Sequence, residues 1–453
     1  MLRTEPALIA RAIQALRVVP NLRAGFVLSF LLTTTLVFSA AAAEQTLRAT
    51  DGKALDLFGF SVAISGDTAV AGSIFNKVGS NEKQGAAYVF NKSGGTWTQQ
   101  AKLVDSDGSV DDEFGLSVAI SGDTVAVGSY KSDIGPNENQ GSTSIFVRSG
   151  TTWTRQAKLT AGDGAAQDLF GYSVAIDGDT VAIGAVEKAV GIYAAQGAAY
   201  VFVRSGGSWV QQASLRDEGG FTSDSFGKSV ALSGDTLVVG ADRYDVGTNR
   251  DQGVAYVFVR NGGVWVQQAK LTAGDGIQYD RFGQSVAIHG DTIVIGSQAE
   301  PNGSSTIAQL EDPAPSPATY QGAAYVFQRQ DGVWTQQAKL IANDGAANDA
   351  FGYSVALSGD ALAVGAFGVD IGPNALQGAV YVFTRSLGVW TQRSKLTAGD
   401  GRIYDDLGYS VGISGDDIVA GASYADAGAS VDQGAAYVFQ ASLPPPRMRA
   451  VRK

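Results

Sequence analysis

The stretch Phe170–Leu215 reads FGYSVAIDGDTVAIGAVEKAVGIYAAQGAAYVFVRSGGSWVQQASL and is one copy of a unit that recurs through the chain. The opening Phe-Gly pair, replaced by Leu-Gly in the last copy, returns at intervals of 56 residues, apart from one interval of 69. The seven copies begin at Phe58, Phe114, Phe170, Phe226, Phe282, Phe351 and Leu407. A fixed period of this length indicates a repeat architecture rather than several independent globular domains.

Each copy contains four short runs rich in Val, Ile, Tyr, Phe and Trp, which in the quoted copy are SVAI, TVAIG, GAAYVFVR and SWVQQASL. This composition is typical of strands separated by Gly- and Asp-containing turns. Gly-Asp joins the first two runs in all seven copies. A glycine at the first position of a two-residue loop favours a type II′ hairpin. The sequence therefore predicts an all-β fold, a seven-bladed β-propeller of four-stranded antiparallel blades.

The seventh copy ends with Ala435–Phe439 and lacks a fourth run of its own. The missing run lies at the other end of the chain. There, Gln45–Gly52 aligns with Ala101–Gly108 one period later, and Leu47 matches Leu103. We therefore expect the N-terminal segment to pair with the last run and to close the ring. Closure of this kind leaves no open sheet in the last blade.

The tryptophans and the third strand bear on packing. Both faces of the third strand are apolar, as expected when each blade is packed between two neighbours. All six tryptophans occupy one position at the start of the fourth strand: Trp97, Trp153, Trp209, Trp265, Trp334 and Trp390. An aromatic residue at a fixed position could stack on a sugar, but six copies in one register favour repeated packing.

The two ends of the chain differ from the repeats. Residues 1–43 contain four arginines, an apolar run at 25–39 and four consecutive alanines, which is the order of a secretory signal peptide. We expect cleavage after Ala43, and an uncleaved membrane anchor is the alternative. The propeller would then span 44–440, and 441–453 would be a Pro-rich basic tail without fixed structure. The expected mature protein is extracellular or periplasmic, has no transmembrane span and is a monomer.

Composition excludes several function classes. The formal net charge is −11, and both ends are basic, so the repeats are more acidic still. Such a surface disfavours nucleic acid and suits cations or basic partners. The chain has no cysteine, and its only histidine, His289, stands where other copies have Ser or Asp before the Gly-Asp turn. A cysteine nucleophile is thus excluded, and a Ser-His-Asp site is not supported.

The turns divide between the two ends of the ring. The Gly-Asp and Ser-Gly-Gly hairpins share one end, the hairpin face. The loops between strands two and three and the connections between blades share the other end, the loop-rich face. Each connection carries a second aspartate just before Phe-Gly: Asp56, Asp112, Asp168, Asp224, Asp280, Asp349 and Asp405. Six connections also carry a first aspartate five residues earlier: Asp51, Asp107, Asp163, Asp275, Asp344 and Asp400. Copy four offers Asp217 and Glu218 slightly earlier instead.

Two interpretations of these aspartate pairs are open. Two carboxylates in a Gly-containing loop could chelate a hard cation such as Ca²⁺. The candidate metal ligands are Asp107 with Asp112, Asp163 with Asp168, Asp275 with Asp280, and Asp344 with Asp349. In the structural alternative, Asp-Gly forms a turn and the second aspartate accepts hydrogen bonds from backbone N–H groups. Carboxylate pairs can also hydrolyse glycans, but a catalytic pair should be unique, and these recur in every blade.

The loop between strands two and three holds 11 residues in six copies. Four aspartates share one position in it and are candidate ligand-binding residues: Asp133, Asp245, Asp370 and Asp426. In copy five the loop holds 24 residues, Ser297–Tyr320, with four prolines. A single long loop on a symmetric ring could add specificity, or it could be a neutral insertion.

The repeated pattern FGxSVAxxGD, VxxGA and QGAAYVF resembles the FG-GAP repeat of the integrin α-subunit propeller, in the short form of bacterial secreted proteins. The resemblance covers residues 45–439 and implies a seven-bladed propeller that acts in extracellular binding or adhesion. One feature departs from the integrin pattern. The DxNxDGxxxD calcium loop between the first two strands is replaced by Gly-Asp alone, which is too short to supply the oxygens that calcium takes.

We expect a secreted or cell-surface binding or adhesion protein without enzymatic activity. It would recognise a protein or glycan partner through its acidic loop-rich face. The alternatives are a carboxylate-dependent hydrolase of glycans or other polymers and a purely structural surface protein.

Overall fold

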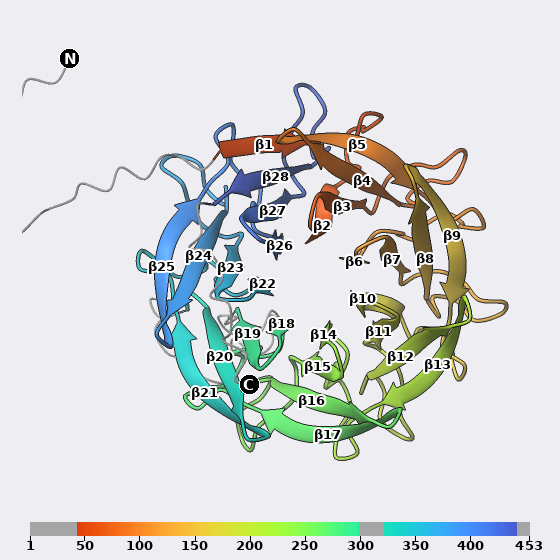
Figure 1. The fold of residues 1–453 in the computed structure, drawn as a ribbon, viewed down its shortest axis with the longest axis vertical. Coiled ribbons are helices and arrows are strands. Elements are labelled where there is room, and N and C mark those ends of the chain that lie inside the picture. Colours follow the sequence, from red (N-terminus) through yellow and green to blue (C-terminus); the bar gives the residue numbers. More distant parts are fainter. Residues whose placement is uncertain (1–42, 299–319, 442–453) are drawn as a thin grey trace, which may run out of the picture. The chain divides into compact units, whose positions relative to one another are not determined.

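A computed structural model describes residues 43–298 and 320–441. Over these residues the chain forms 28 strands in seven four-stranded sheets and contains no helix. The sheets stand around a common axis, with one strand of each next to the axis and one at the perimeter (Figure 1). The predicted seven-bladed β-propeller is confirmed. Of the predicted signal peptide and tail, all but Ala43 and Ala441 lie outside the described residues.

The strands of each blade follow the order of the chain. Blade 1 contains β2 (Phe58–Ser65), β3 (Thr68–Ser73), β4 (Ala86–Ser93) and β5 (Thr96–Leu103). Blade 2 contains β6 (Val118–Ser121), β7 (Thr124–Ser129), β8 (Ser142–Ser149) and β9 (Thr152–Leu159). Blade 3 contains β10 (Phe170–Asp177), β11 (Thr180–Ala185), β12 (Ala198–Ser205) and β13 (Ser208–Leu215). Blade 4 contains β14 (Ser229–Ser233), β15 (Thr236–Ala241), β16 (Val254–Asn261) and β17 (Val264–Leu271). Blade 5 contains β18 (Ser285–His289), β19 (Thr292–Ser297), β20 (Ala323–Gln330) and β21 (Val333–Leu340). Blade 6 contains β22 (Ser354–Ser358), β23 (Ala361–Ala366), β24 (Ala379–Ser386) and β25 (Val389–Leu396). Blade 7 contains β26 (Ser410–Ser414), β27 (Asp417–Ala422) and β28 (Ala435–Gln440), and its outer strand is β1 (Ala43–Leu47).

The N-terminal strand closes the ring, as the repeat alignment predicts. Strand β1 pairs antiparallel with β28, with Glu44 opposite Phe439 and Leu47 opposite Ala436. A charged pair also crosses this seam, because Lys92 Nζ lies 2.6 Å from a carboxylate oxygen of Asp417. At the next seam the corresponding contact is a hydrogen bond from Arg148 to the Thr68 hydroxyl. The first and last blades are therefore joined by strand pairing and by charge.

Close backbone contacts at the seams explain why Phe-Gly, Ser and the second glycine recur. A Cβ on Gly72 of blade 1 would lie 2.0 Å from the carbonyl oxygen of Gly115 in blade 2. Gly115 itself has a φ of +98°, and its own Cβ would lie 2.5 Å from the Ala86 carbonyl. Ser61 donates a hydrogen bond of 2.7 Å from Oγ to the same Gly115 carbonyl. Only glycine allows the two blades to approach this closely.

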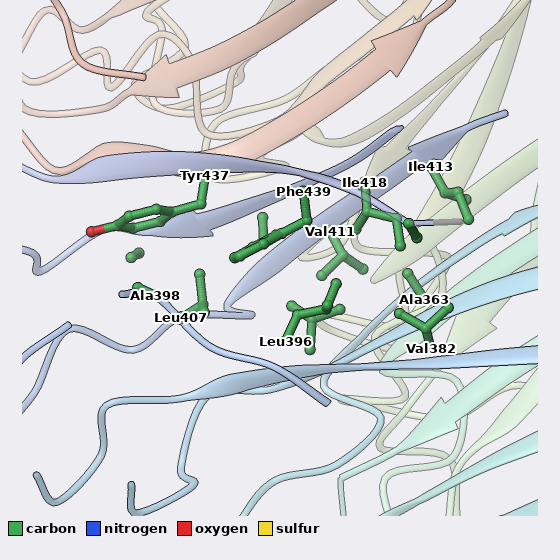
Figure 2. Close-up of a cluster of buried hydrophobic side chains, with 14 of the residues drawn as sticks. Ala363, Val382, Leu396, Ala398, Leu407, Val411, Ile413, Ile418, Tyr437 and Phe439 are labelled. Atoms are coloured by element: carbon green, nitrogen blue, oxygen red, sulfur yellow. The ribbon is translucent and has the colours of Figure 1, made fainter. Parts of the chain in front are cut away.

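Apolar side chains fill the space between neighbouring blades. Figure 2 shows one such layer, in which Val382 and Leu396 of blade 6 meet Val411, Ile418 and Phe439 of blade 7. The phenylalanine of each Phe-Gly pair is fully buried at the edge of such a layer. These layers make each blade apolar on both faces, as predicted for the third strand.

The tryptophans pack at the perimeter. The ring of Trp209 lies 5.2 Å from the Arg204 guanidinium, and its Nε1 donates a hydrogen bond of 2.9 Å to Gln156 of the preceding blade. The packing role predicted for the tryptophans is therefore the one observed.

At the hairpin face, Gly66 has a positive φ and Asp67 does not, as a type II′ turn requires. His289 is exposed at the same face.

Candidate binding site

The second aspartate of each connection holds a turn of backbone together. Asp112 Oδ2 accepts a hydrogen bond of 2.8 Å from the backbone N–H of Ser109, and the same contact recurs in all seven connections. The residues on either side, Asp111 and Glu113, have φ values of +64° and +54°, which are strained for side chains other than glycine. All seven second aspartates are buried, and this burial raises the pKa of Asp112. The structure thus shows the turn in which the second aspartate accepts hydrogen bonds from the backbone, the structural interpretation of the aspartate pairs.

The first aspartate of each connection contacts a basic side chain of the protein. Lys102 Nζ lies 2.6 Å from Asp51, whose other oxygen accepts a hydrogen bond of 2.8 Å from the Tyr88 hydroxyl. Partial burial opposes charge on Asp51, but the hydrogen bonds from Lys102 and Tyr88 outweigh it and lower the pKa. In the other connections the pairs are Lys158–Asp107 at 3.6 Å, Lys188–Asp163 at 3.8 Å, Lys270–Asp217 at 3.6 Å, Lys339–Asp275 at 2.6 Å, Lys395–Asp344 at 2.8 Å and Arg48–Asp400 at 3.7 Å. The first aspartate of each pair proposed to bind calcium therefore already contacts a lysine ammonium group. Over residues 43–298 and 320–441, no group of three or more acidic or histidine side chains is arranged around a common metal position.

We expect calcium to leave the melting temperature of the protein unchanged. A bound ion would have to displace a basic side chain from the aspartates and would need six to eight oxygens, which two carboxylates do not supply. The measurement is thermal unfolding of the mature protein with excess calcium and with a chelator. A ligand at a hundred times its Kd adds about 2.7 kcal/mol to the free energy of unfolding, so bound calcium would be readily detected. A melting temperature that rises on titration with calcium would contradict this expectation and would support calcium binding by the aspartate pairs.

The four loop aspartates fix the loop between strands two and three and remain at the surface. Asp133 Oδ1 accepts a hydrogen bond of 2.8 Å from the backbone N–H six residues later, and the other three do the same at 2.8 to 3.1 Å. Asp133, Asp245 and Asp370 are exposed, whereas Asp426 is half-buried and lies 3.8 Å from Arg402. The loop-rich face thus carries exposed negative charge in several blades.

Residues of the innermost strands, which stand next to the axis in Figure 1, line an open axial cavity of about 280 Å³. Its lining includes the third residue of each Phe-Gly-x-Ser motif, and we call these seven residues the axial ring. They are Phe60, Leu116, Tyr172, Lys228, Gln284, Tyr353 and Tyr409. All seven are half-buried. The serine that follows each of them donates to a glycine carbonyl of the next blade, so the serines belong to the seams.

The axial ring lies toward the loop-rich face, because residues that directly follow the second strands pack on it. The Tyr130 ring lies 5.9 Å from that of Tyr172, and the Phe367 ring lies 4.7 Å from that of Tyr353. Neighbouring members of the ring also touch: the Tyr409 ring is 4.8 Å from Tyr353 and 4.9 Å from Phe60. Blades 6, 7 and 1 therefore present a cluster of aromatic side chains to the axial cavity.

Lys228 is the charged member of the axial ring. Its Nζ donates a hydrogen bond of 2.8 Å to the Tyr172 hydroxyl and lies 4.8 Å from the centre of that ring. None of the residues that the structure describes places a carboxylate oxygen within 4.0 Å of this nitrogen. Burial disfavours its charge, but Tyr172, Asp242 and Tyr409 outweigh burial and raise the pKa. Lys228 is therefore charged at neutral pH.

The axial ring is the feature that the search for repeated acids misses. The third position of Phe-Gly-x-Ser is aromatic, aliphatic, amide or cationic in different copies, while the positions around it are nearly constant. Positions that all copies share serve the shared packing of the blades. A position that varies between copies beside constant neighbours is not required for the packing of the blades. Variation at the third position of the motif is therefore the sequence signal that indicates the cavity.

The comparison with known families is consistent with this geometry. The model of the FG-GAP repeat matches residues 42–90, 97–146, 153–202, 209–258, 265–327, 334–383 and 390–439. Each match runs from the outer strand of one blade to the third strand of the next, so the first match begins beside β1. None of the curated proteins compared with the chain matches it. Because the seven matches take up most of its length, the chain belongs to the FG-GAP repeat family.

Proposed function

We propose that this protein is a secreted or cell-surface binding protein without enzymatic activity, and that it recognises a protein or glycan partner with its loop-rich face. An FG-GAP propeller is consistent with ligand binding or adhesion. The observation that carries the proposal is the axial cavity, whose lining differs from blade to blade within a ring of similar blades.

The cavity has the properties of a binding site. Ligand sites in proteins are concave and mostly apolar, with a few polar groups that orient the ligand. The half-buried rings of Phe60, Tyr353 and Tyr409 supply apolar surface, and Lys228 and Gln284 supply polar groups. The glycine contacts at the seams hold these side chains on a rigid frame, which reduces the entropy lost on binding.

The repeated acids support a non-enzymatic role. The second aspartates accept hydrogen bonds from the backbone, and the first aspartates contact basic side chains. Both sets therefore have a structural role in every blade. The loop-rich face has a negative electrostatic potential from three exposed aspartates, Asp133, Asp245 and Asp370. This potential would attract a basic partner. Export is inferred from residues 1–43. Across the described residues, the structure holds no helix capable of crossing a bilayer.

One carboxyl group favours the alternative of a glycan hydrolase. Burial, followed by the nearby charges of Asp405 and Asp432, raises the pKa of Asp406 to about 7. A carboxyl group that is protonated near neutral pH can act as a general acid. Release of reducing ends from a polysaccharide panel, abolished by Asp406→Asn, would favour this alternative over simple binding.

A matched pair of triple variants tests which face binds. The mature protein is probed against immobilised glycans and extracellular protein domains. Asp133, Asp245 and Asp370 on the loop-rich face are changed to Asn, which keeps the Oδ1 acceptor of each loop. Asp67, Asp331 and Asp416, exposed on the hairpin face, are changed to Asn in the control. Both variants lose three negative charges.

We expect the loop-face variant to bind a basic partner about tenfold more weakly at low salt, because rim charges mainly set the association rate. The hairpin-face variant should bind like the parent. Weakened binding in the hairpin-face variant alone, or a parent that captures nothing on the array, would contradict the proposed function.

A further inference from the structure

We infer that the axial cavity binds the terminal acidic residue of a glycan, with its anionic group at Lys228 and its sugar ring against the aromatic members of the axial ring. The inference rests on the proposed binding function and names the class of ligand. It follows from three features of the cavity: its charge, its size and its surroundings.

Charge points to an anion. Lys228 is the only charged side chain among the described residues that line the cavity. Its hydrogen-bond partner is the Tyr172 hydroxyl, which accepts from one of the three ammonium hydrogens. A partly buried ammonium group with no carboxylate in contact has lost hydration that an anionic ligand would replace with charge-assisted hydrogen bonds.

Size and lining point to a single sugar ring. A volume of about 280 Å³ lies just below the range for sites that take drug-sized ligands, so it suits one ring-sized group rather than a folded segment. The Tyr409 ring lies 4.9 Å from the Phe60 ring and 4.8 Å from the Tyr353 ring, and this aromatic cluster offers apolar surface to the C–H face of a sugar. The tyrosine hydroxyls and the Gln284 amide supply donors and acceptors for sugar hydroxyls.

The negative charges around the cavity favour a glycan whose acidic sugar residue is at its end. Exposed Asp133, Asp245 and Asp370 lie on the same loop-rich face. A polymer with an acid on every residue would bring like charges together there, which weakens binding. A glycan that is neutral along its length and acidic at its terminus places its one charge at Lys228 and avoids that repulsion.

The test compares two disaccharides that differ in one group. One ends in glucuronic acid and the other in glucose, so that only a carboxylate replaces a hydroxymethyl group. Titration calorimetry with the mature protein gives both dissociation constants at 0.15 M salt, where charges farther than about 8 Å apart are largely screened. Three variants are measured beside the parent: Lys228→Gln, Lys228→Gln with Gln284→Lys, and Lys53→Gln. Glutamine is the native residue at this position in blade 5, so the ring accommodates it. Lys53 is an exposed lysine on a blade connection.

We expect the parent to bind the acidic disaccharide at least about tenfold more tightly than the neutral one, as one charge-assisted contact implies. Lys228→Gln should abolish this preference by weakening the binding of the acidic disaccharide at least about tenfold. Adding Gln284→Lys should restore part of the preference, because the cation returns to the adjacent blade. Lys53→Gln should behave like the parent.

Equal binding of both disaccharides by the parent, binding of neither, or a preference that survives Lys228→Gln would overturn the inference. The proposed function would still stand in those cases if the two triple variants separate the faces on the array. It would fail together with the inference if the array captures no partner or if only the hairpin-face variant binds more weakly.

Discussion

A chain that begins at Ala49 should melt about 5 to 10 °C below a chain that begins at Ala43, or should aggregate. The shorter chain lacks β1 and therefore exposes the edge of β28, whose backbone groups would then be open to pairing with another molecule. It also removes Leu47 from the apolar layer between blades 7 and 1. Burial of a leucine side chain contributes about 1.5 to 3 kcal/mol by itself.

Contacts from residues 44–48 to three other parts of the ring add to this loss. The Gln45 side chain accepts from the Trp97 backbone N–H at 2.9 Å and donates to the Trp97 carbonyl at 2.6 Å, which ties β1 to blade 1. Glu44 accepts a hydrogen bond from the Gly399 backbone N–H in the connection that enters blade 7. Arg48 donates to the Gly434 carbonyl. The strand therefore joins the ends of the ring as well as completing a sheet.

Thermal unfolding of the two chains measures the effect, and both lack residues 1–42, so the signal segment does not enter the comparison. Light scattering during the same experiment reports aggregation through the exposed edge. Identical melting curves without aggregation would mean that blade 7 is stable with three strands, in contradiction to the role assigned to β1.

Most of the fold could be predicted from the sequence because the information is repeated. A single Phe-Gly pair is uninformative, but six in register, with Leu407-Gly408 as the seventh, identify the period, and the period places every strand and hairpin. The alignment of Leu47 with Leu103 by the same period identifies β1 as the strand that closes the ring. Periodicity also favours a structural role for the tryptophans, and the structure agrees.

The contacts of the acids could not be predicted in the same way. Asp51 and Lys102 are 51 residues apart in the chain, and they meet because the blade connection folds back over the end of the blade. Nothing in the spacing of the aspartates reveals that each will meet a basic side chain. The repeats show which residues recur, whereas their contacts depend on the path of the connections in space.

The axial cavity escaped sequence reasoning for a different reason. A search for repeated residues selects the positions that every blade needs for packing. Lys228 occurs once and has no counterpart of the same charge at its position in the other copies. Its significance depends on the closure of the ring, which brings seven dispersed positions to one axis. The role of the copy-five insertion stays a prediction, because residues 299–319 lie outside the described residues.

The glycine of the second strand should be among the least replaceable residues in the ring. We expect Gly184→Ala to lower the free energy of unfolding by about 2 to 4 kcal/mol. A Cβ at this position would lie 2.0 Å from the Gly227 carbonyl oxygen of the next blade and 2.4 Å from Ser173 Oγ. The carbonyl belongs to the backbone, so the blades themselves would have to separate. Overpacking of this kind costs about 1 to 3 kcal/mol, and loss of the 2.8 Å hydrogen bond from Ser173 to Gly227 adds about 1 kcal/mol.

Gly178→Ala in the same blade is the matched control. Gly178 is in the Gly-Asp hairpin, where its φ is +55° and a Cβ would have no atom within 4 Å. This substitution carries only the backbone cost of a left-handed alanine, about 1 to 2 kcal/mol. Denaturant unfolding of the parent and both variants measures the three free energies directly. A Gly184→Ala variant that unfolds like the parent would mean that the seam yields without cost, and the recurrence of the seam glycines would then have a cause other than close packing of the blades.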